Sequence, residues 1–310
     1  MTVNHTKIRH LALVGPTASG KSALALHAAE AFGDVELVSV DSMQVYRSLD
    51  IGTAKPTSAD QQRVPHHLID CVEPSADWSV VQHQAAARGA VADIEARGHR
   101  ALLVGGTGLY VQAVVDDLRF PGEDLALRAE LEAWTAEPGG VAAAFAELEV
   151  RDPVAAGRID PHNARRIVRA LEVIRLTGEP FSSFGPGMAC FGPTAFPVSM
   201  VGVWLPREAL GRRIERRAAQ MRCGGLVDEV RSVRGELSRT AAQAIGYKEV
   251  LAHLDGESTE DEAFDLIARR TRSFARRQRM WFRRDPRIEW LATTENPCVL
   301  APALLARWSP

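Results

Sequence analysis

The sequence predicts an α/β protein with a parallel sheet at its core and a helical insertion in its middle. Two observations predict the core: short apolar runs alternate with helical stretches, and two of these runs end in glycine-rich turns. A third observation, the loss of this alternation after Phe120, predicts the insertion. Alternating strands and helices favour a doubly wound parallel sheet, which binds its ligands at the carboxyl ends of the strands.

The first predicted elements are a strand, a glycine-rich loop and a helix. The apolar run from Ile8 to Val14 precedes "GPTASGKS" (15–22), and "SALALHAAEAF" supplies helix formers up to Gly33. The loop fits G-x-x-x-x-G-K-[ST], in which backbone N–H groups, the lysine and the hydroxyl surround a phosphate group. We therefore expect a P-loop NTPase-like core, a phosphate-containing ligand and Mg²⁺ bound at Ser22.

The next two predicted strands differ in how they end. "VELVSV" (35–40) runs into Asp41, whereas the strand at 101–104 runs into "GGTG" without a carboxylate. A P-loop NTPase needs an acidic residue at a strand end to organise Mg²⁺ and water. Asp41 is the candidate, and its position alone allows either that role or the role of a general base.

The chain after Phe120 predicts a separate helical domain and then a return to the core. Several short helices are expected, and the last of them carries an apolar stripe of Ile167, Leu171 and Ile174. A strand and helices follow the glycine- and proline-rich connector. The predicted domains are a core formed by 1–119 and 195–310, which includes C-terminal helices, and a helical insertion formed by 120–194.

Composition restricts the class of protein. The chain is 46% hydrophobic and 25% charged, and its apolar runs are shorter than the ~18 residues that span a bilayer. Four scattered cysteines form no C-x-x-C pair, which predicts reduced thiols in a cytoplasmic protein. His66 and His67 are adjacent on a predicted strand and point to opposite faces, so we expect no transition metal there.

Charge is distributed unevenly. The net charge is only −2, yet the stretch 269–287 carries nine arginines and one acidic residue, Asp285. Arginines interleaved with Trp281 and Phe282 suit phosphate contact and stacking on unpaired bases. Trp281 also fits an apolar stripe of the C-terminal helix, so it is a candidate for the core as well as for RNA.

Six motifs occur together and in order. They are "GPTASGKS", "DSMQVYRSLDIGTAKP" (41–56), "PHHLID" (65–70), "GGTGLYVQAVVDDL" (105–118), "RRIVRALEVIRLTGEP" (165–180) and "QAIGYKEV" (243–250). With these motifs the chain resembles the bacterial tRNA dimethylallyltransferases, also called tRNA isopentenyltransferases. The resemblance extends from about residue 8 to about residue 290. It is weakest over 120–160, and nothing matches beyond Leu291.

The resemblance implies the reaction and its catalytic residues. The family transfers a dimethylallyl group from dimethylallyl diphosphate to N6 of the adenosine that follows the anticodon on its 3′ side. Asp41 matches its general base, Thr17 matches a threonine near the scissile oxygen, and Arg217 matches an arginine that contacts the diphosphate from the other side. The family usually has an aromatic residue after that arginine, whereas this chain has Ala218. The implied diphosphate-binding residues are Gly15, Pro16, Thr17, Ala18, Ser19, Gly20, Lys21 and Ser22.

The resemblance also implies the contacts with the tRNA anticodon stem-loop. Residues next to Asp41 lie beside an adenine that has left its stack, and Gln44 suits an adenine edge by its paired donor and acceptor. Met43 is equally a candidate for core packing. The expected tRNA-binding residues are Asp41, Ser42, Met43, Gln44, Thr107, Arg165, Arg166, Arg169, Lys248, Arg276, Arg277, Gln278, Trp281 and Arg283.

Three other functions remain open at this level. A small-molecule P-loop kinase would use ATP and an acceptor pocket, and an RNA-binding nucleotide switch would need a second carboxylate for Mg²⁺. An isopentenyltransferase acting on free adenine nucleotides would share the core but would not need the arginine clusters. Nothing in the sequence requires more than a monomer.

Overall fold

The chain forms two compact units. The computed structural model describes residues 10–116, 118–184 and 190–308. One unit comprises Met1–Asp117 and Phe191–Pro310, and the other comprises Leu118–Cys190. The second unit therefore ends earlier than the predicted insertion of 120–194. The connector already belongs to the first unit there, because the Ala195 N–H donates to the Val115 carbonyl at 2.8 Å.

The first unit is built on a parallel sheet. Its six strands in the described residues are β1 (His10–Val14), β2 (Val35–Val40), β3 (His66–His67), β4 (Arg100–Gly105), β5 (Val198–Trp204) and β6 (Ile288–Ala292). Their order is β3-β2-β4-β1-β5-β6, and every pairing is parallel. Ile8 and Arg9, predicted to begin the first strand, lie outside the described residues. The sequence predicted only helices in the C-terminal part of the chain, so β6 was not predicted.

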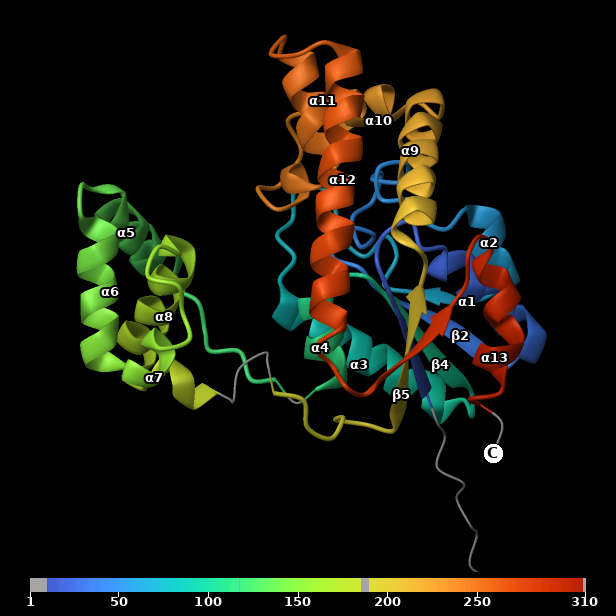
Figure 1. Ribbon diagram of the computed structural model, residues 1–310, viewed down its shortest axis with the longest axis horizontal. Helices are drawn as coiled ribbons and strands as arrows, with labels where there is room; N and C mark the ends of the chain where they lie inside the picture. Colours follow the sequence, from blue (N-terminus) through green and yellow to red (C-terminus); the bar gives the residue numbers. More distant parts are fainter. Residues whose placement is uncertain (1–9, 117, 185–189, 309–310) are drawn as a thin grey trace, which may run out of the picture. The chain divides into compact units, whose positions relative to one another are not determined.

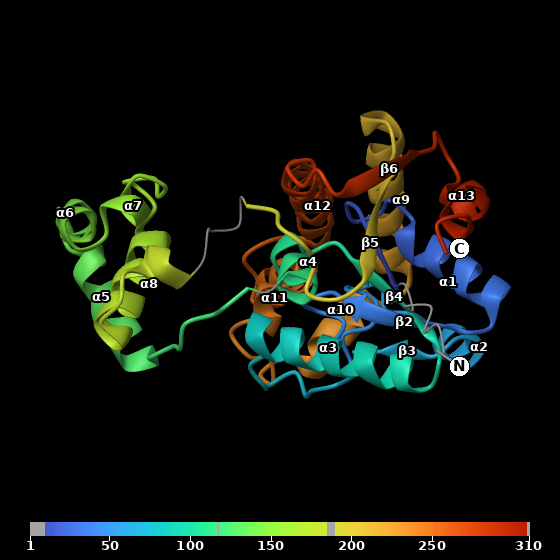
Figure 2. The same ribbon diagram turned by 90° about the horizontal axis from the view of Figure 1, so that it is seen from below.

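The sheet has an apolar core on each face because successive side chains of a strand point to opposite faces. On β1, Leu11 and Leu13 join one cluster with α1 (Lys21–Phe32) and α13 (Ala301–Leu305), whereas Ala12 and Val14 join the other. Figures 1 and 2 show α1 and α13 on one side of the sheet and α3 (Val80–Ala96) on the other. Each fully buried leucine contributes about 2 kcal/mol to this packing.

Further helices of the first unit surround these layers. They are α2 (Ser58–Arg63), α4 (Gly108–Val115), α9 (Arg207–Cys223), α10 (Leu226–Val233), α11 (Tyr247–Leu254), α12 (Glu260–Phe282), and the short 3-10 helices η2 (Ala241–Gln243) and η3 (Pro297–Leu300). Figure 1 shows α9 and α12 rising beyond the end of the sheet at which β5 stops. The chain after Leu291, where the resemblance ends, packs on α1: Trp308 meets Phe32 edge-to-face at 5.6 Å between ring centroids.

The second unit is helical, as predicted. It contains α5 (Leu125–Ala136), α6 (Gly140–Arg151), α7 (Pro153–Ala156), α8 (Ala164–Thr177) and η1 (Phe181–Phe184). The predicted stripe of Ile167, Leu171 and Ile174 is buried in the core of this unit. Asn163 begins α8 by accepting the Arg166 N–H, and Gly178 ends it at φ +75°.

Within the described residues, no helix is both long enough and apolar enough to cross a membrane.

Candidate active site

A cavity of about 740 Å³ opens at the carboxyl ends of the sheet strands. The loop after β1, the residues after β2 and the turn after β4 all reach it, because parallel strands bring these segments to the same edge. Residues of α9 and α12 line its other walls. The chain thus collects segments from both ends of the sequence around one space.

The loop at 15–20 has the backbone geometry of a phosphate-binding loop. Gly20 adopts φ +84°, a left-handed conformation that leads into α1 at Lys21. Ala18 also adopts a left-handed conformation, φ +60°, which is uncommon for a residue with a side chain. Arg213 supports this conformation, since its Nε donates to the Ala18 carbonyl at 2.7 Å. A helix N-terminus and a lysine therefore face the same cavity.

Lys21 is electrostatically coupled to two other residues of the cavity. Burial lowers the pKa of its amine to about 8, Asp41 opposes that shift, and Arg217 adds to it. Burial likewise lowers the pKa of Arg217, and Asp41 again opposes the shift. Two desolvated cations and one carboxylate therefore share this space. Such a cluster suits an anionic ligand that completes the balance of charge.

Thr17 is held from two sides. Its hydroxyl accepts a hydrogen bond from Arg217 Nη1 at 3.0 Å, and its backbone N–H donates to Gln278 Oε1 at 2.8 Å. The Gln278 amide also donates to the Gly106 carbonyl at 2.7 Å, so one side chain links the loop after β1 to the turn after β4. A Cβ at Gly106 would lie 2.7 Å from Gln278 Nε2 and 3.3 Å from Lys21 Nζ. A side chain at this position would therefore displace the Gln278 amide from its place.

Asp41 follows β2 directly and lines the cavity with Ser42 and Met43. Its Oδ1 accepts the Met43 N–H at 2.9 Å, which orients the carboxylate through a turn of its own backbone. Thr107, after β4, lines the same cavity. These four predicted residues lie together.

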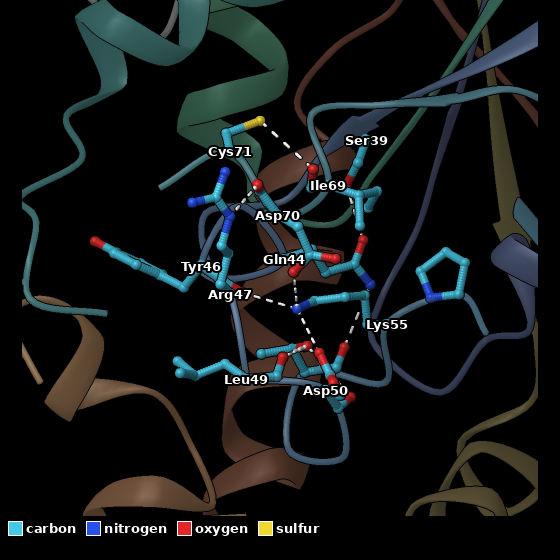
Figure 3. A network of polar contacts seen from close by, with 12 residues as sticks. Ser39, Gln44, Tyr46, Arg47, Leu49, Asp50, Lys55, Ile69, Asp70 and Cys71 are labelled. Atoms are coloured by element: carbon cyan, nitrogen blue, oxygen red, sulfur yellow. Dashed lines mark hydrogen bonds and ion pairs between the residues drawn. The ribbon is translucent and has the colours of Figure 1, made fainter. Parts of the chain in front are cut away.

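Gln44 also lines the cavity, but its amide is engaged within the protein (Figure 3). Its Oε1 accepts the Ser39 hydroxyl at 2.8 Å, and its Nε2 donates to the Thr53 and Ala54 carbonyls at 3.3 and 3.2 Å. Pairing with an adenine edge stays a prediction, and it would require exchanging these bonds.

Lys55 stabilises the segment that begins at Asp41 (Figure 3). Its side chain is 3% exposed, and Nζ donates to the Tyr46 carbonyl at 2.8 Å. It also pairs with Asp50 at 2.5 Å and with Asp70 at 2.6 Å. A buried lysine with two carboxylates is a structural ion pair, and it fixes the segment that begins at Asp41.

The basic helix α12 places its predicted residues in different environments. Arg276 and Arg277 are both exposed, but only Arg277 lines the cavity. Trp281 packs on the backbone at Gly108, where a Cβ would lie 2.2 Å from the indole, and Arg284 stacks 4.6 Å from its ring. Arg283 is exposed and lies 6.0 Å from the Trp204 ring. Trp281 therefore takes part in core packing.

The remaining predicted tRNA contacts belong to α11 and to α8 of the second unit. Lys248, at the start of α11, is exposed and donates to Gln243, which lines the cavity. Arg165 and Arg166 are exposed on α8 of the second unit. Arg169 is instead engaged there, since it pairs with Glu172 at 2.9 Å and donates to the carbonyls of 121 and 122.

Sequence reasoning missed several residues of the cavity. Arg213, Arg216 and Gln220 line it together with Arg217, all from α9. Their spacing of three and four residues on a helix was the available signal. Ala218, which departs from the family pattern, does not line the cavity but a groove between α9 and α12.

The donor set of the cavity fits Mg²⁺ bound through a ligand. Ser22 and Asp41 offer a hydroxyl and a carboxylate, and both line the cavity with Lys21. Among the described residues, no three His, Cys, Asp or Glu side chains are grouped as in a metal site made by protein alone. Magnesium commonly binds through one or two protein oxygens, water and substrate phosphates.

The fold and the cavity define an α/β protein with a P-loop-like core, whose loop after β1 has the backbone geometry of a phosphate-binding loop. The model of the IPP transferase family matches residues 44–285, which excludes the loop itself. The chain is 49% identical over 294 residues to the tRNA dimethylallyltransferase of Kineococcus radiotolerans, covering 92% of this chain and 91% of that protein. It is 51% identical over 285 residues to that of Salinispora arenicola, covering 91% and 81%. The chain belongs to the IPP transferase family.

Solved structures agree with this assignment. A full-length tRNA isopentenylpyrophosphate transferase from Bacillus halodurans is 40% identical with a TM-score of 0.71, over 97% of this chain and 95% of that one. A eukaryotic dimethylallyltransferase captured acting on tRNA has a TM-score of 0.78 at 24% identity, over 93% of this chain and 74% of that one. The second likeness shows a shared fold.

Proposed function

We propose that the protein is a prenyltransferase that moves a dimethylallyl group from dimethylallyl diphosphate to tRNA. The acceptor is N6 of the adenosine that follows the anticodon on its 3′ side. The observation that carries the proposal is the meeting of Asp41 with Lys21 and Arg217 in one cavity. A base and two cations are what the attack of an amine and the departure of a diphosphate require.

The loop at 15–22 binds the diphosphate in this proposal. Its backbone N–H groups and the N-terminus of α1 face the phosphate oxygens. As the bond between C1 of the prenyl group and oxygen breaks, its electron pair moves to the diphosphate. Lys21 and Arg217 stabilise that charge without needing to reorganise, since Arg217 is already bonded to Thr17 at 3.0 Å. The diphosphate leaves intact, so the loop transfers no phosphate.

Asp41 acts on the other partner. The N6 lone pair is delocalised into the adenine ring, so the amine is a weak nucleophile. A carboxylate that accepts an N6 proton as the new N–C1 bond forms removes the positive charge that would otherwise build up. The base must leave its stack to reach the carboxylate. Ser42, Met43 and Thr107, which line the cavity beside Asp41, are then its nearest neighbours.

The basic helices hold the rest of the stem-loop. Arg277 lines the cavity, and further arginines of α12 and Lys248 are exposed. In this proposal they contact phosphates, which position the RNA without reading its sequence. Arg165 and Arg166 of α8 extend this binding from the second unit. Mg²⁺, when bound through Ser22 and the diphosphate, supplies further positive charge against the leaving group.

The chain works as a monomer in the cytoplasm in this proposal. Lys21, Asp41 and Arg217 of one chain line the cavity together, which supports this part of the proposal. Light scattering of the purified protein with and without tRNA measures the mass of the active species. A dimer that loses activity on dilution would overturn the monomer.

A transfer assay with two labels tests the proposed reaction. Purified protein, Mg²⁺ and unmodified tRNA are incubated with labelled dimethylallyl diphosphate or with γ-labelled ATP. We expect the prenyl label to enter RNA without ATP and to be lost in Asp41→Asn. Transfer of the ATP label alone would replace the proposal with a kinase, and prenylation of free adenine nucleotides in preference to tRNA would change the acceptor.

A further inference from the structure

A single carboxylate on α10 holds one wall of the cavity. Glu229 accepts the backbone N–H groups of three successive residues: Asp50 at 3.0 Å, Ile51 at 2.8 Å and Gly52 at 3.2 Å. Hydrogen bonds to an ionised acceptor are stronger than those between neutral groups. The turn at 50–52 is therefore fixed by a residue that lies 177 to 179 positions further along the chain.

Tyr247 strengthens the same attachment. Its hydroxyl donates to Glu229, and its ring packs on Gly52 so closely that a Cβ there would lie 2.3 Å from Cε2. Burial and the neighbouring Glu229 carboxylate raise the pKa of Tyr247 well above the ordinary value. The hydroxyl consequently remains a donor throughout the physiological range, and Gly52 is held from two directions.

The fixed turn touches Arg217. The Gly52 carbonyl accepts a hydrogen bond from Arg217 Nη2 at 3.4 Å, while Nη1 of the same guanidinium donates to Thr17 Oγ1 at 3.0 Å. The planar guanidinium thus lies between the phosphate loop and a carbonyl that Glu229 positions. Burial makes its charge costly, and the negative charge of Asp41 offsets only part of that cost. The Thr17 hydroxyl and the Gly52 carbonyl are the hydrogen-bond acceptors that orient the guanidinium.

We propose that Glu229 is a positioning residue that aims Arg217 at the diphosphate through the Gly52 carbonyl. The inference rests on the proposed function in one respect, the assignment of diphosphate as the ligand. Without Glu229 the turn at 50–52 loses its acceptor, the carbonyl moves, and Arg217 keeps only its bond to Thr17. Glu229 touches no reacting atom in this account, so its effect must pass through Arg217.

A double-mutant cycle with inorganic diphosphate as the probe tests this dependence. Diphosphate affinity in the presence of Mg²⁺ is measured by calorimetry for the full chain, Glu229→Gln, Arg217→Ala and the double variant. We expect Glu229→Gln to weaken the Kd about tenfold in the wild-type background and less than about twofold in Arg217→Ala. A role in general stability alone would instead weaken binding equally in both backgrounds.

Two further variants serve as a control and as a substitute in this experiment. Asp228→Asn changes a neighbouring, exposed carboxylate of α10 that pairs with Arg231, and it should leave the Kd unchanged. Glu229→Asp keeps the charge but is too short to reach all three N–H groups, so it replaces Glu229→Gln in the cycle if that variant melts early. Equal losses in both backgrounds, or no loss at all, would overturn the inference. The probe is not a prenyl donor, so coupling between Glu229 and Arg217 is measured without the transfer reaction. If the two residues are coupled but the protein transfers no prenyl group, the proposed function is refuted and the inference stands.

Discussion

Glu172 of the second unit binds two arginines, whereas Lys21 and Arg217 in the first unit's cavity make no ion pair with the described residues. Glu172 is fully buried and lies 3.0 Å from Arg128 and 2.9 Å from Arg169. Burial alone would raise the pKa of Glu172 and lower that of Arg128. These bonds outweigh burial, so the pKa of Glu172 is lowered and that of Arg128 is raised. In the cavity, burial instead lowers the pKa of both cations.

This difference separates structure from function. Charges that neutralise one another within the protein hold its helices together and leave nothing for a ligand. Desolvated cations that lack such partners are costly to the folded protein and become useful only when an anion binds. Both kinds of cluster contain basic residues from helices, so residue type alone does not distinguish them.

Asp41→Asn should produce the largest change, because it removes the proposed general base. We expect prenyl transfer to fall about a thousandfold, as the loss of a general base typically does. Diphosphate affinity should stay the same or tighten, since a negative charge near the ligand is removed. Single-turnover assays and calorimetry measure the two quantities. Parallel loss of both would mean that Asp41 is structural.

Glu172→Gln should damage the paired cluster and leave the cavity intact. Removing one partner of a buried pair costs about 3 kcal/mol of the free energy of unfolding. Because the pKa of Glu172 is lowered, this stabilisation is present above the carboxyl's ordinary pKa and is lost as pH falls through its lowered pKa. Urea titrations at neutral and acid pH measure it.

Glu130→Gln is the matched control for that variant. Its carboxylate is 70% exposed and lies 3.5 Å from Arg175, so its loss should cost less than about 0.5 kcal/mol. Equal costs for the two substitutions would show that burial of the pair does not determine its contribution to stability.

Loss of the Lys21 charge should lower kcat/KM for dimethylallyl diphosphate at high pH. With its pKa lowered to about 8, the amine is charged below that pH and loses its charge as pH rises through it. The ratio kcat/KM for dimethylallyl diphosphate reports the free enzyme and should therefore decline above about pH 8, approaching tenfold per unit. Lys21→Arg should abolish this decline, whatever its effect on the maximum rate. A profile that stays flat in the wild type would contradict the assigned pKa.

Arg165→Ala and Arg169→Ala should separate the two roles on a single helix. Arg165 is exposed, so its loss should weaken tRNA binding a few-fold and reduce the salt slope by about 1. Arg169 is bonded to Glu172, so its loss should chiefly lower the stability of the second unit. Filter binding at several salt concentrations and thermal melting distinguish them. A reversed pattern would assign Arg169 to the RNA.

Much of the first unit was predictable because its signals are local. The loop at 15–22, its flanking strand and helix, and the acid after β2 are contiguous motifs, and the structure brings them to one edge of the sheet. The boundaries were less accurate: the strand predicted at 101–104 is β4, Arg100–Gly105. The strand β6 was missed because it is a short edge strand after a long helix, in the stretch where the resemblance ends.

The sequence by itself determined the α/β class, the phosphate loop, the helical insertion and the family, since each depends on the type and spacing of residues close together in the chain. Only the tertiary structure decided which basic residues pair with a buried carboxylate and which do not. Arg169 and Arg217 look alike in sequence, but one meets a buried carboxylate and the other a carbonyl and a threonine hydroxyl. The Glu229 contact with Ile51 spans 178 positions, and helical or strand periodicity carries no information about which backbone a side chain will meet at that separation.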